Sequence, residues 1–139
     1  MTDHPQGDLL VHLIALQSRI NKRLAGPLSG HGLSLTEYLV LRELSQAPDG
    51  RMRRIDLAAQ VGLSASGVTR LLNPMEKVGL VRKEEAARDA RISLVALTPA
   101  GKRIFREAST SFNDVAQAFL EPLGARDQSY LQKITDALK

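Results

Sequence analysis

The sequence has no cysteine and few aromatic residues, only three Phe and two Tyr among 139 positions. Without cysteine the chain forms no disulfide, offers no thiolate to a metal and cannot sense oxidants through a thiol. No apolar run approaches the roughly 20 residues that cross a bilayer, and residues 1–8 lack the apolar core of a signal peptide. These absences predict a cytoplasmic protein that has no membrane partner.

Catalytic and metal-binding patterns are also absent from the sequence. The three histidines, His4, His12 and His31, do not have the spacing of metal ligands and lie near no nucleophile motif. The chain contains no glycine-rich loop of the kind that cradles phosphate groups. We therefore expect no enzyme activity, no cofactor and no metal site.

Positive charge is concentrated in the middle of the chain. The length of the whole chain favours one domain over residues 1–139. Residues 51–91 hold nine Lys or Arg against five Asp or Glu, so this segment alone carries +4, the formal net charge of the whole chain. A cationic segment favours a polyanionic partner. From charge alone, a solvated basic surface is the alternative explanation.

Residues 54–99 follow the order helix, turn, helix, strand, basic loop, strand, which predicts a winged helix-turn-helix. Gly62 is a typical end for the first helix, and Ser64 is a typical N-terminal cap for a second helix over residues 64–78. The connection between them is short and contains glycine, as the motif requires. One face of the first helix carries the apolar residues Leu57, Ala58 and Val61.

The second helix of the motif has two chemically different faces. Pro74 lacks an N–H group and disfavours helical geometry at the preceding residue, so we expect a bend between Asn73 and Pro74 that leaves the carbonyl of Arg70 unpaired. The face expected to point to the core carries Val68, Leu71, Leu72, Met75 and Val78. The opposite face, which suits base edges and phosphates, carries Ser66, Thr69, Arg70 and Asn73.

The expected wing follows this helix. Gly79, Leu80 and Val81 begin one strand, and residues 92–97 form the returning strand. The segment between them, residues 82–91, is too long for a tight hairpin, so we expect a basic loop there. A short strand over residues 51–53 is expected to pair with the wing.

The N-terminal part of the chain predicts two helices. After a loose tail over residues 1–7, apolar residues at helical spacing predict a helix over residues 8–30, which Pro27 should break or bend. Ser34 and Glu37 fit a capping box for the next helix, and Thr36 is the alternative cap. The segment from Ala47 to Gly50 is expected to be a turn.

The C-terminal part predicts a long helix and a last helix within residues 100–138. Thr98 is a typical cap for the long helix, with Pro99 at its first position. The helices of residues 8–30 and 100–138 have more apolar surface than a winged core needs, so we expect them to form a homodimer. A monomer in which these helices cap the core is the alternative.

A spaced signature follows the second motif helix: Gly79-Leu80-Val81, Asp89-x-Arg91 and Leu97-Thr98-x-x-Gly101. In this signature the chain resembles the MarR family, the multiple antibiotic resistance regulators, and the resemblance extends over both flanks. It implies a mainly α fold with a small β-wing. Residues 34–99 would form the winged helix-turn-helix lobe and residues 8–30 and 100–138 the dimerisation helices. It also implies a sequence-specific transcriptional regulator of double-stranded DNA.

Such a regulator is expected to be a homodimeric repressor on a pseudo-palindromic operator, with residues 64–78 of each protomer in successive major grooves. Ser64, Ser66 and Gly67 lie at the helix start, where N–H groups favour phosphate, although Gly67 alternatively has no special role. Arg70 either reads a guanine or contacts a phosphate. The candidates for base reading are Thr69, Arg70 and Asn73.

Further DNA contacts are expected from the wing and from the start of the first motif helix. The resemblance implies that the wing tip reaches the minor groove or its phosphates. Arg91 alternatively forms a structural ion pair with Asp89, and the two roles are compatible. Arg53 and Arg54 either contact phosphate or are merely solvated. The candidates are Arg54, Arg82, Lys83, Arg88, Asp89 and Arg91.

Two other functions remain open at this point, a winged-helix protein-interaction module and a non-specific architectural DNA-binding protein. The resemblance also implies that a small aromatic or phenolic ligand relieves repression by binding between the dimer helices and the lobes. Core packing explains the candidate residues equally well. The candidates for lining such a cleft are His12, Tyr38, Phe105 and Phe112.

Overall fold

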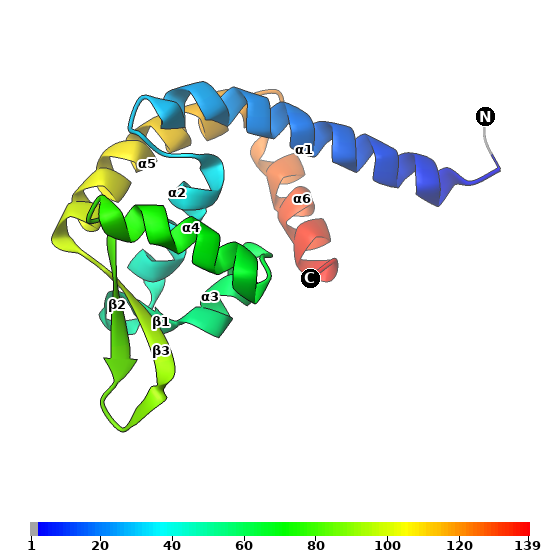
Figure 1. Ribbon diagram of the computed structural model, residues 1–139. Helices are drawn as coiled ribbons and strands as arrows, with labels where there is room; N and C mark the ends of the chain where they lie inside the picture. Colours follow the sequence, from blue (N-terminus) through cyan, green and yellow to red (C-terminus); the bar gives the residue numbers. More distant parts are fainter. Residues whose placement is uncertain (1–2) are drawn as a thin grey trace.

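The computed structural model describes residues 3–139, with Ala90 described without its side chain. Six α-helices and a small three-stranded sheet make up the described chain, so the predicted mainly α fold with a β-wing is confirmed (Figure 1). The helices are α1 (Pro5–Ser29), α2 (Leu35–Gln46), α3 (Arg54–Val61), α4 (Ala65–Lys77), α5 (Pro99–Leu120) and α6 (Ala125–Ala137). A 3-10 turn (Pro48–Gly50) leads into the strands β1 (Arg51–Arg53), β2 (Val81–Ala86) and β3 (Asp89–Leu97).

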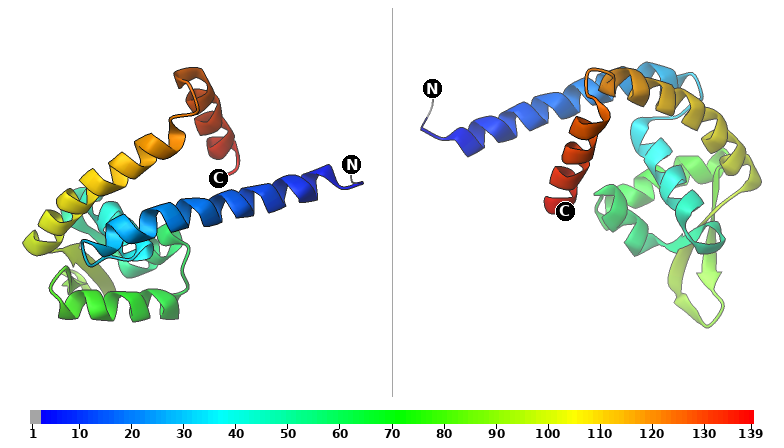
Figure 2. Two further views of the ribbon diagram at one scale, coloured as in Figure 1. Left: turned by 90° about the horizontal axis from the view of Figure 1, so that it is seen from above. Right: turned by 180° about the vertical axis from the view of Figure 1, so that it is seen from behind.

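The winged lobe is built from α2, α3, α4 and the sheet, whose antiparallel strands lie in the order β1-β3-β2. Arg51 pairs with Ala96 across β1 and β3, which confirms the short strand predicted over residues 51–53. The helices of the lobe pack on one another and on the sheet, and α5 lies across α1 and α2 (Figures 1 and 2). The fully buried side chains at the centre include Tyr38, Leu41, Leu44, Leu57, Leu72, Met75 and Val95.

Most of the predicted helix caps are present. Ser34 and Glu37 form the capping box, because the Glu37 N–H donates to Ser34 Oγ at 3.1 Å and the Ser34 N–H donates to Glu37 Oε1 at 2.8 Å. Thr36 is therefore not the cap. Gly62 ends α3 in the left-handed conformation with φ of 72°, which glycine adopts without the penalty of a Cβ.

Helix α1 is longer than the sequence predicted. It begins at Pro5, because proline at the first helical position has no N–H to leave unpaired. The predicted start at residue 8 is therefore late, and a loose tail up to residue 7 is wrong from Pro5 onward. The first part of that tail, residues 1–2, lies outside the described residues.

The expected break at Pro27 does not occur, because α1 continues through Pro27 to Ser29. Proline falls in the last turn of the helix, where it removes only one backbone hydrogen bond. The end of the helix is held by fully buried Leu28, whose carbonyl accepts the N–H of Leu33 at 3.1 Å. Tertiary packing therefore carries the helix past a residue that would end it in isolation.

The wing is a hairpin, and the expected basic loop over residues 82–91 is wrong. Strand β2 runs to Ala86 and β3 begins at Asp89, so only Ala87 and Arg88 lie between the strands. A register shift between Glu85 and Ala86 accommodates the turn. The polar side chains of this segment do not prevent pairing, since both strands project from the lobe (Figure 1).

The residues at the end of α4 differ from the prediction in two ways. Gly79 does not start a strand but follows the helix with φ of 80°, and its N–H donates to the Glu76 carbonyl at 3.0 Å. Val78 was expected in the core, yet its exposed fraction is 70%, because it is the cap after the last helical turn. Helix α4 is continuous across Pro74, and the bend there stays a prediction.

A close junction joins the end of α4, the start of β2 and the start of α5. The Thr98 hydroxyl bonds to the carbonyl oxygens of Gly79 and Leu80 at 2.5 and 3.0 Å. The same oxygen accepts the N–H of Gly101 at 2.9 Å and caps α5. A Cβ on Gly101 would lie 2.1 Å from the Leu80 carbonyl oxygen, so only glycine fits there. The Leu-Thr-x-x-Gly motif is thus a packing requirement of this junction.

The terminal helices leave the lobe together. The N-terminal part of α1 projects beyond the lobe, and α6 lies on the same side (Figures 1 and 2). All thirteen residues of α6 are exposed. Within residues 3–139, no helix is both long enough and apolar enough to span a bilayer. Large apolar side chains are exposed on both terminal segments: Leu9, Leu10, Val11, Leu13, Ile14, Tyr130, Leu131, Ile134 and Leu138.

The junction predicts a large effect for a very small substitution. We expect Gly101→Ala to lower the free energy of unfolding by about 1–3 kcal/mol, because the new methyl group overlaps the Leu80 carbonyl. The matched control is Gly26→Ala on α1, where a Cβ meets nothing within 4 Å. That control should be neutral or stabilise the helix by about 0.5–1 kcal/mol. Chemical denaturation at equal protein concentration measures both, and equal effects would contradict the steric argument.

Candidate nucleic-acid interface

The start of α4 is an exposed set of backbone donors with a serine cap. Ser64 Oγ accepts the N–H of Gly67 at 3.0 Å and lies 3.3 Å from Ser66 Oγ. A Cβ on Gly67 would lie 3.1 Å from Ser64 Oγ, so glycine lets the cap close tightly. This contact gives Gly67 a local structural role. The free N–H groups and the positive end of the helix dipole favour an anion at this position.

Thr69 is tied to the first helix of the motif. Its hydroxyl donates to the Ala65 carbonyl at 2.9 Å and accepts a short hydrogen bond from the Arg54 guanidinium. The hydroxyl hydrogen is therefore already used within the protein. Arg54 is only partly exposed and braces α3 against α4 rather than standing free in solvent.

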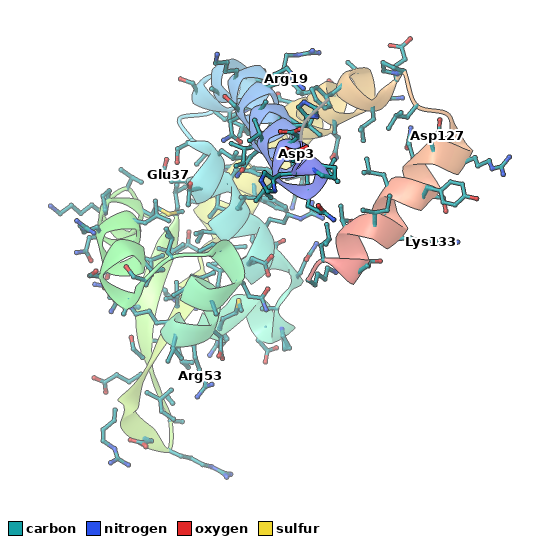
Figure 3. All side chains as sticks on the ribbon, turned by 90° about the vertical axis from the view of Figure 1, so that its right-hand side faces the viewer. Asp3, Arg19, Glu37, Arg53, Asp127 and Lys133 are labelled. Atoms are coloured by element: carbon teal, nitrogen blue, oxygen red, sulfur yellow. The ribbon has the colours of Figure 1, made fainter. Side chains whose placement is uncertain are left out.

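A groove of about 770 Å³ runs between α3, the start of α4 and the wing. It brings together three of the predicted residues, Arg54, Thr69 and Arg91, which come from three different elements. Arg53 lies at the same groove, and its guanidinium pairs with Asp56 at 2.9 Å. Figure 3 shows Arg53 at the base of the lobe, on the opposite side of the molecule from Lys133 of α6.

The middle of α4 presents one free cation and one restrained amide. Arg70 is exposed and has no hydrogen bond or ion pair with another described residue. Asn73 Oδ1 accepts from Lys83 Nζ of β2 at 2.9 Å, which leaves the amide NH₂ of Asn73 facing outward as a donor. Lys83 also lies 3.4 Å from Glu76 Oε2. The wing therefore fixes the orientation of a predicted base-reading side chain.

The two faces of the wing carry different cations, because side chains alternate along a strand. Lys83 faces α4, whereas Arg82 lies on the opposite face and donates to Glu84 Oε1 at 2.8 Å. The other oxygen of Glu84 accepts from Arg51 at 3.0 Å. The Arg82 hydrogen bond, followed by the charge of Arg51, lowers the pKa of Glu84. Arg82 therefore lies on the face of the wing away from α4 and is paired with Glu84.

The wing tip holds one free and one paired arginine. Arg88 is exposed in the turn and has no ion pair with another described residue. Arg91 pairs with Asp89, with Nε at 3.1 Å from Oδ1 and a second nitrogen at 3.1 Å from Oδ2. The backbone N–H of Arg91 also donates to Asp89 Oδ1 at 3.0 Å. The Asp-x-Arg motif is therefore a bidentate pair that fixes the hairpin beyond its turn.

Three of the four candidate ligand residues form one aromatic cluster. Tyr38 is fully buried, stacks on Phe112 with ring centroids 4.5 Å apart, and lies 5.4 Å from the ring of Phe105. Its hydroxyl lies 3.0 Å from Ser109 Oγ. His12 is exposed on α1 and makes no hydrogen bond or ring contact to this cluster within residues 3–139. Packing between α2 and α5 accounts for the cluster.

The sequence did not reveal several contacts that organise the interface. Lys83 with Asn73 and Arg51 with Glu84 join elements that are far apart in the chain, and no local pattern identifies such pairs. His31 Nε2, from the segment between α1 and α2, lies 2.8 Å from Ser111 Oγ of α5. Had residues 81–86 been predicted as a strand, the alternation of side chains would have placed Lys83 on the opposite face from Arg82 and Glu84.

An exposed polar second helix beside a basic hairpin defines a winged helix-turn-helix protein of the DNA-binding class. The profile of the MarR family matches residues 31–92. Over these residues the chain matches the MarR family of DNA-binding transcriptional regulators, and its whole fold is the MarR winged-helix fold.

The relatives of this chain are distant in sequence but close in fold. The crystal structure of AbsC, a MarR family regulator from Streptomyces coelicolor, is 27% identical with a TM-score of 0.88, covering 99% of this chain and 93% of that one. Sco3205 from the same organism, solved in complex with DNA, is 24% identical with a TM-score of 0.89 and covers 99% and 90%. The transcriptional repressor MprA of Escherichia coli K12 is 22% identical over 98% of this chain and 78% of its own length.

The wing-tip pair predicts a measurable pKa. Hydrogen bonds from the Arg91 side chain, and after them the one from its backbone N–H, hold the pKa of Asp89 below the ordinary value. The folded hairpin therefore favours the ionised carboxylate. The stabilisation is complete above the ordinary aspartate pKa and is lost as the pH falls through the lowered one. NMR titration of the Asp89 carboxyl group should show the pKa rising toward the ordinary value in Arg91→Ala and unchanged in Arg88→Ala.

Proposed function

We propose that the protein is a homodimeric repressor that binds a pseudo-palindromic operator through α4 and the wing of each protomer. The observation that carries this proposal is the groove in which the start of α3, the start of α4 and the wing meet, with Arg54, Thr69 and Arg91 around it. Cations and outward donors from three elements surround one exposed helix. This arrangement fits a duplex whose major groove holds the helix and whose backbone passes the flanking cations.

Most of the predicted residues fall into three groups by their role in this proposal. Arg70 is free to read a guanine, and Asn73 offers its NH₂ group because Lys83 holds its oxygen. Ser64 and Ser66 would meet phosphate at the helix start. A larger group of cations contributes by charge or by positioning rather than by base contact: Arg54, Arg82, Lys83, Arg88 and Arg91.

We further propose that residues 1–139 act as one domain with a lobe at residues 34–99 and dimerisation helices on either side. The projecting part of α1 and the fully exposed α6 support this assignment, because both expose large apolar side chains on the same side of the molecule. A second copy is the natural cover for such surfaces, since one patch pairs with its own copy. A two-fold dimer would place the two α4 helices about one duplex turn, ~34–36 Å, apart.

Repression and its relief by a small aromatic or phenolic ligand complete the proposal. The similarity to MprA, which is named a transcriptional repressor, supports repression. The aromatic cluster of Tyr38, Phe105 and Phe112 lies between α2 of the lobe and α5, where a ligand would act on the position of the lobe. Of these rings, Phe105 also lines an open groove.

The dimer assignment is tested with a charge placed in the apolar surface of a terminal helix. We expect Leu13→Glu or Ile134→Glu to shift the protein to monomer in analytical ultracentrifugation, because a carboxylate would be buried without a partner. Val78→Glu is the matched control, since Val78 is also apolar and exposed but lies outside the terminal helices. A wild-type protein that sediments as a monomer at all concentrations would contradict the assignment.

The role of Arg70 is tested by mobility shift with the DNA upstream of the protein's own gene, across a salt series with competitor DNA. We expect Arg70→Ala to reduce discrimination at one operator base pair by about 1–3 kcal/mol. An equal loss on every duplex would instead make Arg70 a phosphate contact. Arg103→Ala on α5 is the matched control, because Arg103 is exposed and lies away from the interface groove.

The competitor DNA in the same assay separates the alternative functions. For specific and non-specific DNA binding alike, the logarithm of the binding constant falls with the logarithm of salt by ~0.9 for each neutralised phosphate, so the slope alone does not distinguish them. Equal binding to all duplexes would favour a non-specific architectural protein, and no binding at low salt would favour a protein-interaction module.

A further inference from the structure

The side chain of Asn73 on α4 is held from outside its own helix by a residue of the wing. Its oxygen Oδ1 accepts a hydrogen bond from Lys83 Nζ of β2 at 2.9 Å, and both residues are exposed. An ammonium group has three N–H donors and no acceptor, so the atom of the amide that faces it must be the oxygen. The contact therefore fixes which way round the Asn73 amide is turned.

Lys83 is itself held in place by the sheet and by α4. Its cross-strand partner is Val95 of β3, and Val81 lies on the same face of β2; both valines are buried. The face of β2 that carries Lys83 is thus anchored on the core, beside α4. The ammonium also lies 3.4 Å from Glu76 Oε2, three residues after Asn73 on α4. Asn73 and Glu76 together therefore hold the ammonium against the helix.

Asn73 lies on the outward face of α4, in line with Ser66 and Arg70. Residues three and seven positions apart share one face of a helix, and all three side chains are exposed. A free asparagine offers an acceptor and two donors to an external partner. With its oxygen turned to Lys83, Asn73 offers mainly the two N–H donors of its NH₂ group. The wing has removed the acceptor half of this side chain.

The four bases differ in what an NH₂ group can meet in the major groove. Guanine presents O6 and N7 and thymine presents O4, which are all acceptors, whereas adenine and cytosine present an amino group, N6 or N4. Asparagine recognises adenine by pairing its oxygen with N6 and its NH₂ group with N7. In Asn73 that oxygen is bonded to Lys83, and the charge of the ammonium opposes the approach of another N–H group. The remaining donors suit the keto oxygen of guanine or thymine.

We infer that Lys83 is a positioning residue for base recognition: by holding Oδ1 of Asn73, it makes Asn73 a donor-only side chain that selects a keto base, guanine or thymine, and rejects adenine and cytosine. Lys83 acts through Asn73 and needs no contact with the base. The wing thereby decides which bases α4 accepts, in addition to any contact of its own with the duplex. The base preference rests on the proposed function, whereas the orientation of the amide does not.

The orientation of the amide is tested without DNA, by NMR of the full chain. In the wild type we expect an ordered Asn73 NH₂ group, with a heteronuclear NOE close to that of the α4 backbone. Lys83→Met removes the donor but keeps an apolar stem, so it should shift these resonances and lower the NOE. Lys83→Arg retains N–H donors and should keep the NOE high. An NH₂ group that is equally mobile in the wild type and in Lys83→Met would overturn the inference.

The base preference is tested by selection from a random duplex library, followed by mobility shifts on duplexes that differ at one base pair. The pair read by Asn73 is the one at which Asn73→Ala loses its preference. There we expect the wild type to prefer guanine or thymine over adenine by about tenfold, as for one base contact. In Lys83→Met the freed oxygen should reduce this preference to about twofold or reverse it in favour of adenine. Lys83→Arg should keep the wild-type preference.

Arg82→Met is the matched control for the loss of charge. Arg82 is the neighbouring cation on β2 but lies on the face away from α4. Its loss should weaken binding to all duplexes alike, leave the base preference at the Asn73 position intact and leave the Asn73 NH₂ resonances unchanged. If Lys83→Met behaves in the same way, Lys83 contributes only charge and the positioning role is wrong.

Two other results would also contradict the inference: a wild type that prefers adenine or cytosine at this position, or an Asn73→Ala variant whose preferences are unchanged throughout the site. Circular dichroism melting establishes that each variant is folded. If the wild type enriches no sequence at all, the proposed function fails and the base preference with it, while the NMR result decides the orientation of the amide separately.

Discussion

The hydroxyl of Thr98 holds the fold together at its most crowded point. It binds the carbonyl oxygens of Gly79 and Leu80 at the exit of α4, and it caps α5 through the N–H of Gly101. The end of α4, the first strand of the wing and the first turn of α5 therefore share one hydrogen-bonding centre. The Leu80 carbonyl prevents the start of α5 from moving closer, and the Thr98 hydrogen bonds oppose its moving away, so α5 is coupled in position to α4 and β2.

The sequence predicted the elements whose ends are decided by local chemistry. The capping box of Ser34 and Glu37, the left-handed Gly62 and the threonine–proline start of α5 are in the structure, since each involves residues within one helical turn. The same local reasoning was wrong about a break at Pro27, because the buried Leu28 carries the helix onward, whereas the bend predicted as the alternative stays a prediction. It was also wrong for the wing, where strand pairing across the sheet overrides the polar composition of the segment.

In the candidate interface, too, the sequence predicted the features that depend on local spacing and missed those that depend on contacts between elements. The helical spacing of polar and apolar residues identified the outward face of α4, including Arg70 and Asn73, because a helix fixes which residues share a face. It did not show which cations are already engaged. Arg54 is bonded to Thr69 and Lys83 to Asn73, whereas Arg70 and Arg88 are exposed. These differences arise from contacts between separate elements, which no spacing rule encodes.

The hydrogen bonds of the Thr69 hydroxyl limit the contacts that this side chain can make with a base. With its proton given to the Ala65 carbonyl and Arg54 bonded to its oxygen, Thr69 has mainly its methyl group left to offer. In the proposed complex that methyl group would sense the C5 methyl of a pyrimidine rather than a hydrogen-bonding edge. Thymine and 5-methylcytosine both carry this C5 methyl group, whereas unmodified cytosine lacks it. Methylation of a cytosine at this position of the operator would therefore change the contact with Thr69.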